Sequence, residues 1–213
     1  MLLNVSIFVK TWRDGAAIAM SRQHVIKCTG SASPQVRASI EIDGEQVCSL
    51  GGISAGARGK ENGGGLLVTM VDRWTGLPET TAWYCTGSDM LESHRLGTIL
   101  KTLDEQYAVC IVSNGDWCRH ASSYLLCQLD RIGGSGIEQI SAETCLPLAL
   151  LGASGLHPGQ GIQALGEDVN GPSAEKATIC ALFFEQEETE SMMIEGSIQE
   201  SLFMQSRLIP LSS

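Results

Sequence analysis

Hydrophobic and polar positions between residues 65 and 165 repeat one order twice: a buried strand, a turn of small residues, and an amphipathic helix. In the first round, an apolar strand at 66–72 meets a turn at 73–76. A second strand then runs to Cys85, and a helix opens at Ser88. Strands joined by short turns and followed by a helix predict a compact module rather than an enzyme cleft.

The second round has the same order. A strand at 107–112 and a turn at 113–116 precede a helix over about 117–132, which stops at the glycine pair 133–134. Glycine is the residue most often found just past a helix end. An apolar strand at 146–151 then closes the module.

Each predicted helix carries one apolar stripe that needs a sheet to cover it. The first helix, over about 88–106, has Ser88 as its N-cap, and the acidic Asp89 and Glu92 follow in its opening turns. Gly97 is a local weakness of about 1 kcal/mol relative to alanine. The two stripes are Leu96, Ile99, Leu100 and Leu103, and Ala121, Tyr124, Leu125, Leu129 and Ile132.

Two short strands at 35–42 and 46–50 precede this region. Asp43 and Gly44 separate them, and both residue types tolerate the positive φ that a two-residue hairpin turn requires. The sequence therefore predicts a tight hairpin here.

Both ends of the chain are predicted to form β-rich arms. Apolar runs at 5–9 and 16–27 surround the turn 13–15 and predict an opening hairpin, and residues 176–184 predict a strand near the other end. A tail at 201–211 mixes apolar and polar residues and is expected to dock on the module or on a neighbouring chain.

The fold class that these elements predict is α+β: a mixed or antiparallel β-sheet sandwich with two packed helices, flanked by β-rich N- and C-terminal arms. We expect an N-terminal β arm at 1–34, a module at 35–165 and a C-terminal extension at 166–213. A chain of 213 residues is long enough for one core with such extensions.

Charge and composition narrow the classes of partner. The formal net charge of -10 and the absence of a Lys/Arg run disfavour nucleic acid, whose phosphates such a surface repels. No apolar run approaches the ~20 residues that span a bilayer, so we expect no membrane insertion. The N-terminus lacks a basic segment and is a poor match to a signal peptide.

Eight cysteines fall mostly within apolar segments, among them Cys85, Cys110, Cys127 and Cys180, and none forms a CxxC pair. Buried reduced thiols that pack as small hydrophobes explain this pattern most simply. A disulfide scaffold would instead predict paired cysteines, with Cys28 and Cys48 as the pair to test.

The densest group of chemically active residues is Asp116, Cys118 and His120, with Cys110 and Cys127 nearby in the sequence. Side chains two positions apart at a helix start diverge by about 200°. Cys118 and His120 are therefore not expected to share a metal, and the spacing does not match structural zinc motifs. We expect no metal and no cofactor.

A nucleophilic Cys118 activated by a helix N-terminus would need a base, and His24, His94 and His157 are the candidates. Nothing in the sequence brings these groups together. The glycine-rich segment 51–65 lacks the Gly-Lys-Ser/Thr ending of a phosphate-binding loop and leads into a strand. No catalytic residue is assigned, and a hydrolase or transferase is the least favoured class.

A binding function has better support. Asp116 and Trp117 lie at a strand-to-helix turn, where a carboxylate accepts sugar hydroxyls and an aromatic ring stacks on a pyranose. The alternative makes Asp116 an N-cap and Trp117 a buried residue at the helix entry. Trp74, at a hairpin tip, is a partner contact if it is exposed. The candidate ligand-binding residues are thus Trp74, Asp116 and Trp117.

The segments 47–50 (VCSL) and 65–76 (GLLVTMVDRWTG), followed by 89–104, 108–116, 122–132 and 148–155 (LALLGASG), resemble the interleukin-like EMT inducer (PANDER-like) domain. That family is also similar to the stem domain of protein O-mannose N-acetylglucosaminyltransferase. The resemblance covers about half of the chain. It implies a sheet sandwich with helices that binds proteins or glycans without catalysis.

Related domains occur in tail and fibre proteins of tailed bacteriophages, and residues 151–162 (LGASGLHPGQGI) resemble those versions. The resemblance implies a non-enzymatic structural or recognition component of a bacteriophage tail, made in the host cytoplasm and located in the virion. Its expected partners are other virion proteins, further copies of itself, and a host-surface glycan or protein. The alternative is a secreted, cytokine-like ligand that binds a glycan or a protein.

Overall fold

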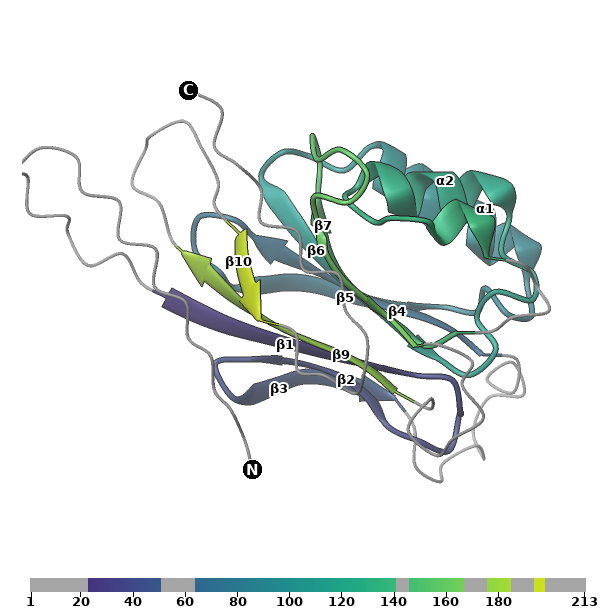
Figure 1. Cartoon of the computed structure of the whole chain (residues 1–213), viewed down its shortest axis with the longest axis horizontal. Helices are drawn as coiled ribbons and strands as arrows, with labels where there is room; N and C mark the ends of the chain where they lie inside the picture. Colours follow the sequence, from purple (N-terminus) through teal and green to yellow (C-terminus); the bar gives the residue numbers. More distant parts are fainter. Residues whose placement is uncertain (1–22, 51–63, 141–145, 167–175, 185–193, 198–213) are drawn as a thin grey trace, which may run out of the picture.

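The computed structural model describes residues 23–50, 64–140, 146–166, 176–184 and 194–197. These residues form three layers, with two helices above one curved sheet and a second sheet below it (Figure 1). The ten described strands are joined into one hydrogen-bonded network that folds back on itself. The predicted α+β class, a sheet sandwich with two packed helices, is confirmed.

The helix-side sheet lies directly under the helices and has the strand order β5-β4-β6-β7-β8. Every neighbouring pair in it is antiparallel. Its strands are β4 (Gly65–Asp72), β5 (Pro78–Tyr84), β6 (Tyr107–Asn114), β7 (Leu148–Ala153) and β8 (Ile162–Leu165).

The outer sheet lies on the side away from the helices and has the order β3-β2-β1-β9-β10, again with antiparallel neighbours. Its strands are β1 (Gln23–Ser31), β2 (Ala38–Ile42), β3 (Glu45–Leu50), β9 (Lys176–Phe184) and β10 (Ile194–Ser197).

The two sheets meet at one point, where Ser31 of β1 pairs in parallel with Asn114 of β6. Beside this junction, the hydroxyl of Ser113 accepts a 2.8 Å hydrogen bond from the Leu148 amide. A Cβ on Gly30 would collide with the Leu148 carbonyl, so only glycine allows this close approach. From the junction the sheets diverge into a sandwich.

Alternate residues of the central strands face two different cores. On β6, Val109 and Ile111 face the helices, whereas Ala108, Cys110 and Val112 face the outer sheet. Both faces of β6 are buried, which explains its continuous apolar sequence. The helix-side core includes Leu66, Leu96, Trp117, Leu125, Leu129 and Leu148. The inter-sheet core includes Ile26, Cys28, Ala38, Ile40, Ala149, Leu151, Ala177, Ile179 and Ala181.

The first helix, α1 (Met90–Lys101), is shorter than predicted at both ends. Its N-cap is Asp89 rather than Ser88, because the Asp89 carboxylate accepts a 2.8 Å hydrogen bond from the Leu91 amide. Helical structure stops at Thr102, well before Gln106. Gly97 packs against the ring of Tyr124 on the second helix, so its small size serves the contact between the helices.

The second helix, α2 (Ser123–Arg131), begins six residues after the predicted start, with Ser122 as its N-cap. The delay has a tertiary cause. Trp117 is fully buried, and its indole N–H donates a 2.8 Å hydrogen bond to the Leu146 carbonyl. The Trp117 carbonyl accepts a 2.7 Å hydrogen bond from the Thr86 hydroxyl. These contacts hold Trp117 outside the helix, which therefore starts only at Ser123.

The hairpin predicted at Asp43-Gly44 is confirmed, with φ of 55° and 80° at the two positions between β2 and β3. The segments predicted as β-rich arms contribute strands β1, β9 and β10 to the outer sheet. Strand β1 lies at the centre of the outer sheet, and β9 pairs with it along its whole length. The boundaries at 34/35 and 165/166 stay predictions. Segments 5–9 and 201–211 lie outside the described residues.

Candidate recognition site at the β4–β5 hairpin

The hairpin tip, residues 73–77 between β4 and β5, combines exposed apolar side chains with a tightly held backbone. Trp74 is 53% exposed and Leu77 is 55% exposed, which places both among the large hydrophobic side chains open to solvent in the described residues. The turn closes through Gly76, whose φ of 67° favours glycine. Its amide donates a 2.9 Å hydrogen bond to the Asp72 carbonyl.

Asp72, the last residue of β4, organises this turn from within. Its Oδ1 accepts hydrogen bonds from the Trp74 amide at 2.9 Å, the Thr75 amide at 2.7 Å and the Thr75 hydroxyl at 3.0 Å. Its Oδ2 accepts a 3.1 Å bond from the side-chain amide of Gln106. The carboxylate thus fixes the backbone that carries Trp74 in the manner of an Asx turn.

These hydrogen bonds also set the protonation of Asp72. Burial alone raises the pKa of this carboxyl, but the bonds from Thr75, Gln106 and Trp74 together outweigh it, and the net pKa lies below its ordinary value. The carboxylate is therefore ionised at neutral pH. Arg73 also connects the hairpin tip to the segment before β6, because its Nη1 donates a 2.7 Å hydrogen bond to the Glu105 carbonyl.

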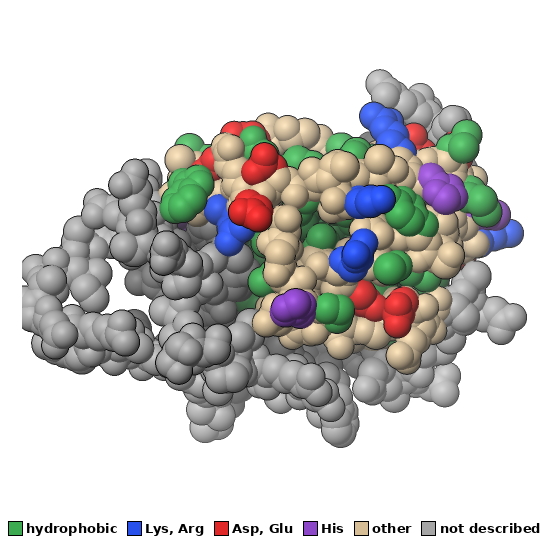
Figure 2. Space-filling view, turned by 90° about the horizontal axis from the view of Figure 1, so that it is seen from above, with side chains coloured by type: hydrophobic (Ala, Val, Ile, Leu, Met, Phe, Trp, Pro, Cys, Tyr) green, Lys and Arg blue, Asp and Glu red, His purple; other side chains and the backbone are tan. Residues whose placement is uncertain are grey.

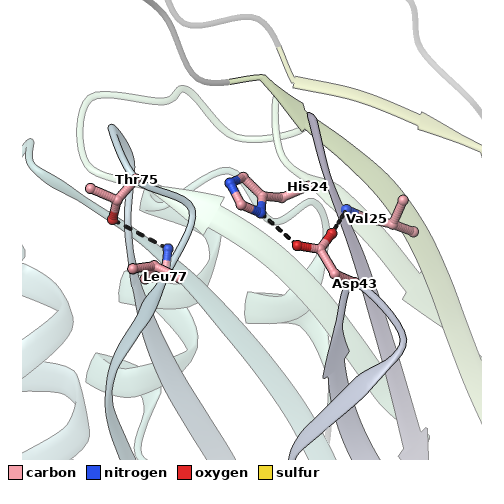
Figure 3. A network of polar contacts seen from close by, with 5 residues as sticks. All are labelled: His24, Val25, Asp43, Thr75 and Leu77. Atoms are coloured by element: carbon pink, nitrogen blue, oxygen red, sulfur yellow. Dashed lines mark hydrogen bonds and ion pairs between the residues drawn. The ribbon is translucent and has the colours of Figure 1, made fainter. Parts of the chain in front are cut away.

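A histidine–aspartate pair lies beside the hairpin tip (Figure 3). His24, in β1, is joined through Nδ1 to Asp43 Oδ2 at 2.7 Å, and Asp43 Oδ1 accepts a 2.8 Å bond from the Val25 amide. The His24 side chain is only 1% exposed. Because Asp43 belongs to the β2–β3 hairpin, the pair ties that hairpin to the first residues of β1.

Gly76 rests directly on the His24 ring, and a Cβ at this position would collide with it. The hairpin tip of the helix-side sheet is thus supported by the outer sheet. A histidine bonded through Nδ1 to a carboxylate supplies two of the three parts of a nucleophilic triad. Here His24 Nε2 is buried and has no hydrogen-bond partner among the described residues, so the third part is not present there.

The other predicted binding residues do not join this site. Trp117 has no exposed surface, so its ring cannot stack on a ligand in this structure, and the alternative of a buried residue agrees with its burial. Asp116 is not an N-cap, because Ser122 caps α2. Asp116 lies partly exposed before Cys118, whose thiol is 3.9 Å from its Oδ1.

The histidines considered as partners of Cys118 lie on separate elements. His94, on α1, stacks on Tyr124 with 5.9 Å between ring centroids, and His157 lies exposed in the turn after β7. His24 is engaged with Asp43. In the part of the chain that the structure describes, no group of three or more His, Cys, Asp or Glu side chains is arranged to hold a metal.

The described cysteines are free thiols in this structure, and not all of them are buried: Cys127 is exposed and Cys48, Cys85 and Cys180 are half-buried. The pair Cys28–Cys48 does not fit a disulfide. Ile40 of β2 pairs with Cys28 on one side and with Cys48 on the other, so a whole strand lies between them. Two strand spacings amount to about 10 Å, beyond disulfide reach.

Sequence reasoning identified Trp74 but missed Asp72, Gln106, His24 and Asp43 as its support. Only the placement of an Asp at the end of a strand, two residues before an exposed aromatic, could have indicated the Asx turn.

Seen from the helix side, charged and hydrophobic side chains of the described residues are interspersed (Figure 2). No helix among the described residues is long and apolar enough to cross a membrane.

No protein-family model matches the chain, and no curated protein matches it.

Proposed function

We propose that this protein is a non-enzymatic recognition and assembly component, of the kind found in bacteriophage tails and tail fibres, and that it binds a protein partner through the β4–β5 hairpin tip. The observation that carries the proposal is a rigid turn that presents Trp74 and Leu77 to solvent. Exposed aromatic residues on preorganised turns contribute much of the energy at protein interfaces, because little conformational entropy is lost on binding.

The chemistry of the tip favours a protein partner over a glycan. A sugar site needs polar groups that converge beside the aromatic ring and take up hydroxyls. The Asp72 carboxylate is bonded to the Trp74 amide, but both of its oxygens already accept hydrogen bonds from the turn and from Gln106. The apolar neighbour Leu77 instead extends the hydrophobic surface. An apolar socket on another protein complements this surface.

The phage-tail setting rests on the resemblance of residues 151–162 and of the wider module to domains of tail and fibre proteins. A tail component functions through its contacts with neighbouring subunits, which agrees with a recognition tip of this kind. The setting is tested by mass spectrometry of purified particles from a culture that produces the chain. Peptides of the chain in intact particles, at a constant ratio to other tail proteins, support it; their confinement to the soluble cell fraction contradicts it.

The partner is identified by site-specific photo-crosslinking in the producing cells. Trp74 is replaced by the photoreactive p-benzoylphenylalanine in the full-length chain, and Leu91, which is 77% exposed at the start of α1, is replaced in the same way as the matched control. We expect position 74 to trap one discrete protein species and position 91 not to trap it. If the folded position-74 variant gives the same products as the control, the hairpin tip is not the recognition surface.

Binding of the purified partner then measures the role of each group. Trp74→Ala should weaken affinity by at least about tenfold, as expected for a central aromatic contact. Asp72→Ala keeps the ring but removes the carboxylate that orders the turn, so a smaller loss of affinity is expected. Leu91→Ala should bind like the parent. Equal affinity for the parent and Trp74→Ala would refute the proposal.

A further inference from the structure

Cys28 and Cys110 face one another across the inter-sheet core. Cys28 is on β1 of the outer sheet and Cys110 is on β6 of the helix-side sheet, and both side chains are fully buried. Both belong to the cluster that fills the space between the two sheets. The Cys110 side chain lies near enough to Cys28 to raise the pKa of its thiol.

Their position relative to the junction explains this proximity. Sheets that pack face to face are separated by about 10 Å, whereas a disulfide needs Cα atoms roughly 4.4–6.8 Å apart. In this fold, Ser31 and Asn114 pair as neighbouring strands, three residues beyond Cys28 and four beyond Cys110. The strands run parallel at this point, so both cysteines lie on the same side of the junction and within four residues of it.

Cys48, which packs against the edge of this core, has other contacts. The sulfur of Cys48 lies 3.4 Å from the hydroxyl of Thr69, and Thr69 is hydrogen-bonded in turn to Thr81 at 2.9 Å. Strand β2 separates Cys48 from Cys28 within the outer sheet. Among the described cysteines, Cys28 and Cys110 are therefore the two that are fully buried in the inter-sheet core, one on each sheet.

We propose that Cys28 and Cys110 are a disulfide site that links the two sheets when the chain folds in the presence of a small-molecule disulfide oxidant. A thiolate of one cysteine attacks the oxidant and forms a mixed disulfide, which releases one small thiol. The second cysteine attacks the protein sulfur of that mixed disulfide, and the second small thiol departs. Two electrons pass from the protein sulfurs to the oxidant, and the two protons end on the released thiols.

The folded, reduced protein protects this site. The hydrogen bond with Cys110, together with burial, raises the pKa of the Cys28 thiol well above its ordinary value, so little reactive thiolate is present. Oxidation is therefore expected while the sheets come together during folding rather than after they have packed. A chain that folds under reducing conditions keeps both thiols. This inference does not depend on the proposed recognition function.

The test refolds the full-length chain from denaturant in a mixture of oxidised and reduced glutathione. Free thiols are then alkylated, and the peptides are analysed by mass spectrometry without reduction. We expect a Cys28–Cys110 linked peptide as the main disulfide product. Because the bond closes a long loop, the oxidised protein should melt roughly 10 °C above the same chain refolded with reductant.

Variants separate this site from other thiols. Cys28→Ala and Cys110→Ala should each abolish the linked peptide and the rise in melting temperature, whereas Cys48→Ala and the exposed Cys127→Ala should retain both. If a buried substitution prevents folding, the oxidised and reduced forms of the parent chain still give the comparison. A main product that links Cys28 to another cysteine, or a parent chain that stays fully reduced, would overturn the inference.

Discussion

The two cores of this protein share strands but differ in the size of their side chains. The helix-side core is built mainly from Leu, Ile, Val and aromatic residues and has no buried Ala, whereas the inter-sheet core contains Ala at several positions and the thiols of Cys28 and Cys110. Small residues are needed where two sheets converge on a backbone junction, and large ones are needed to fill the space beneath rounded helices. Alternate positions of β6 satisfy both demands, so the size of each side chain reflects the layer it faces.

The largest effect is expected from a cavity in the helix-side core. Trp117→Ala removes a fully buried ring together with its hydrogen bond to the Leu146 carbonyl. It should lower the free energy of unfolding by about 3–5 kcal/mol. Urea denaturation measures the loss. Trp74→Ala is the matched control, because deletion of this exposed ring should change stability by less than about 0.5 kcal/mol.

Added side-chain volume should destabilise the protein more in the inter-sheet core than at the margin of the helix-side core. Ala108→Leu forces added methylenes into the fully buried space between the two sheets, and we expect a loss of about 3 kcal/mol. Ala82→Leu, on the half-buried margin of the helix-side core, should cost less than about 1 kcal/mol. Similar losses in the two variants would contradict a difference in tolerance between the cores.

Alkaline pH should act on the inter-sheet core through Cys28. The pKa of this thiol is raised in the folded protein by its hydrogen bond with Cys110 and by burial. Its contribution is fully present below the unfolded pKa of about 8.5. Above that pH the unfolded chain loses the proton while the folded chain keeps it, so stability falls with rising pH.

The slope of the unfolding free energy against pH measures the contribution of the Cys28 thiol. Comparison of unfolding free energies between pH 8 and 10 should show a decline that is shallower in Cys28→Ala by up to about 1.4 kcal/mol per pH unit. Cys127→Ala removes an exposed thiol and should leave the slope close to that of the parent. Parallel slopes in parent and Cys28→Ala would mean that Cys28 titrates alike in both states.

The smallest effect concerns the contact between the helices. Helix propensity alone predicts that Gly97→Ala stabilises α1 by about 1 kcal/mol. A Cβ at this position would approach the ring of Tyr124 to 2.8 Å, so we expect the gain to be cancelled. The double variant with Tyr124→Ala relieves the crowding. In thermal melts, Gly97→Ala should therefore be more favourable in that background than in the parent.

Local signals in the sequence were sufficient for several elements. The Asp43-Gly44 turn, strand β4 and strand β9 follow from residue preferences and alternation within a few positions. The start of α2 did not, because burial of Trp117 depends on partners about 30 residues away in either direction. A turn fixed by tertiary contacts overrides the local preference for helix.

The candidate site also has one part that local sequence predicts and another that it does not. Trp74 was predicted as a contact because a hairpin tip tends to be exposed, and its exposure depends on neighbours in the sequence. Its support was not predictable, because the Asp72–Gln106 bond joins residues 34 positions apart. The contact of Gly76 with His24 joins different sheets. Such contacts follow from topology rather than from periodicity.

The pairing of β1 with β9 has a consequence for biosynthesis. Thr29 and Thr178 lie on neighbouring strands although 149 positions separate them in the chain. During translation β1 leaves the ribosome well before its partner strand β9. Until then one edge of β1 offers unpaired backbone groups to other chains. Nascent chains that stall before residue 176 should therefore depend on chaperones far more than the finished protein.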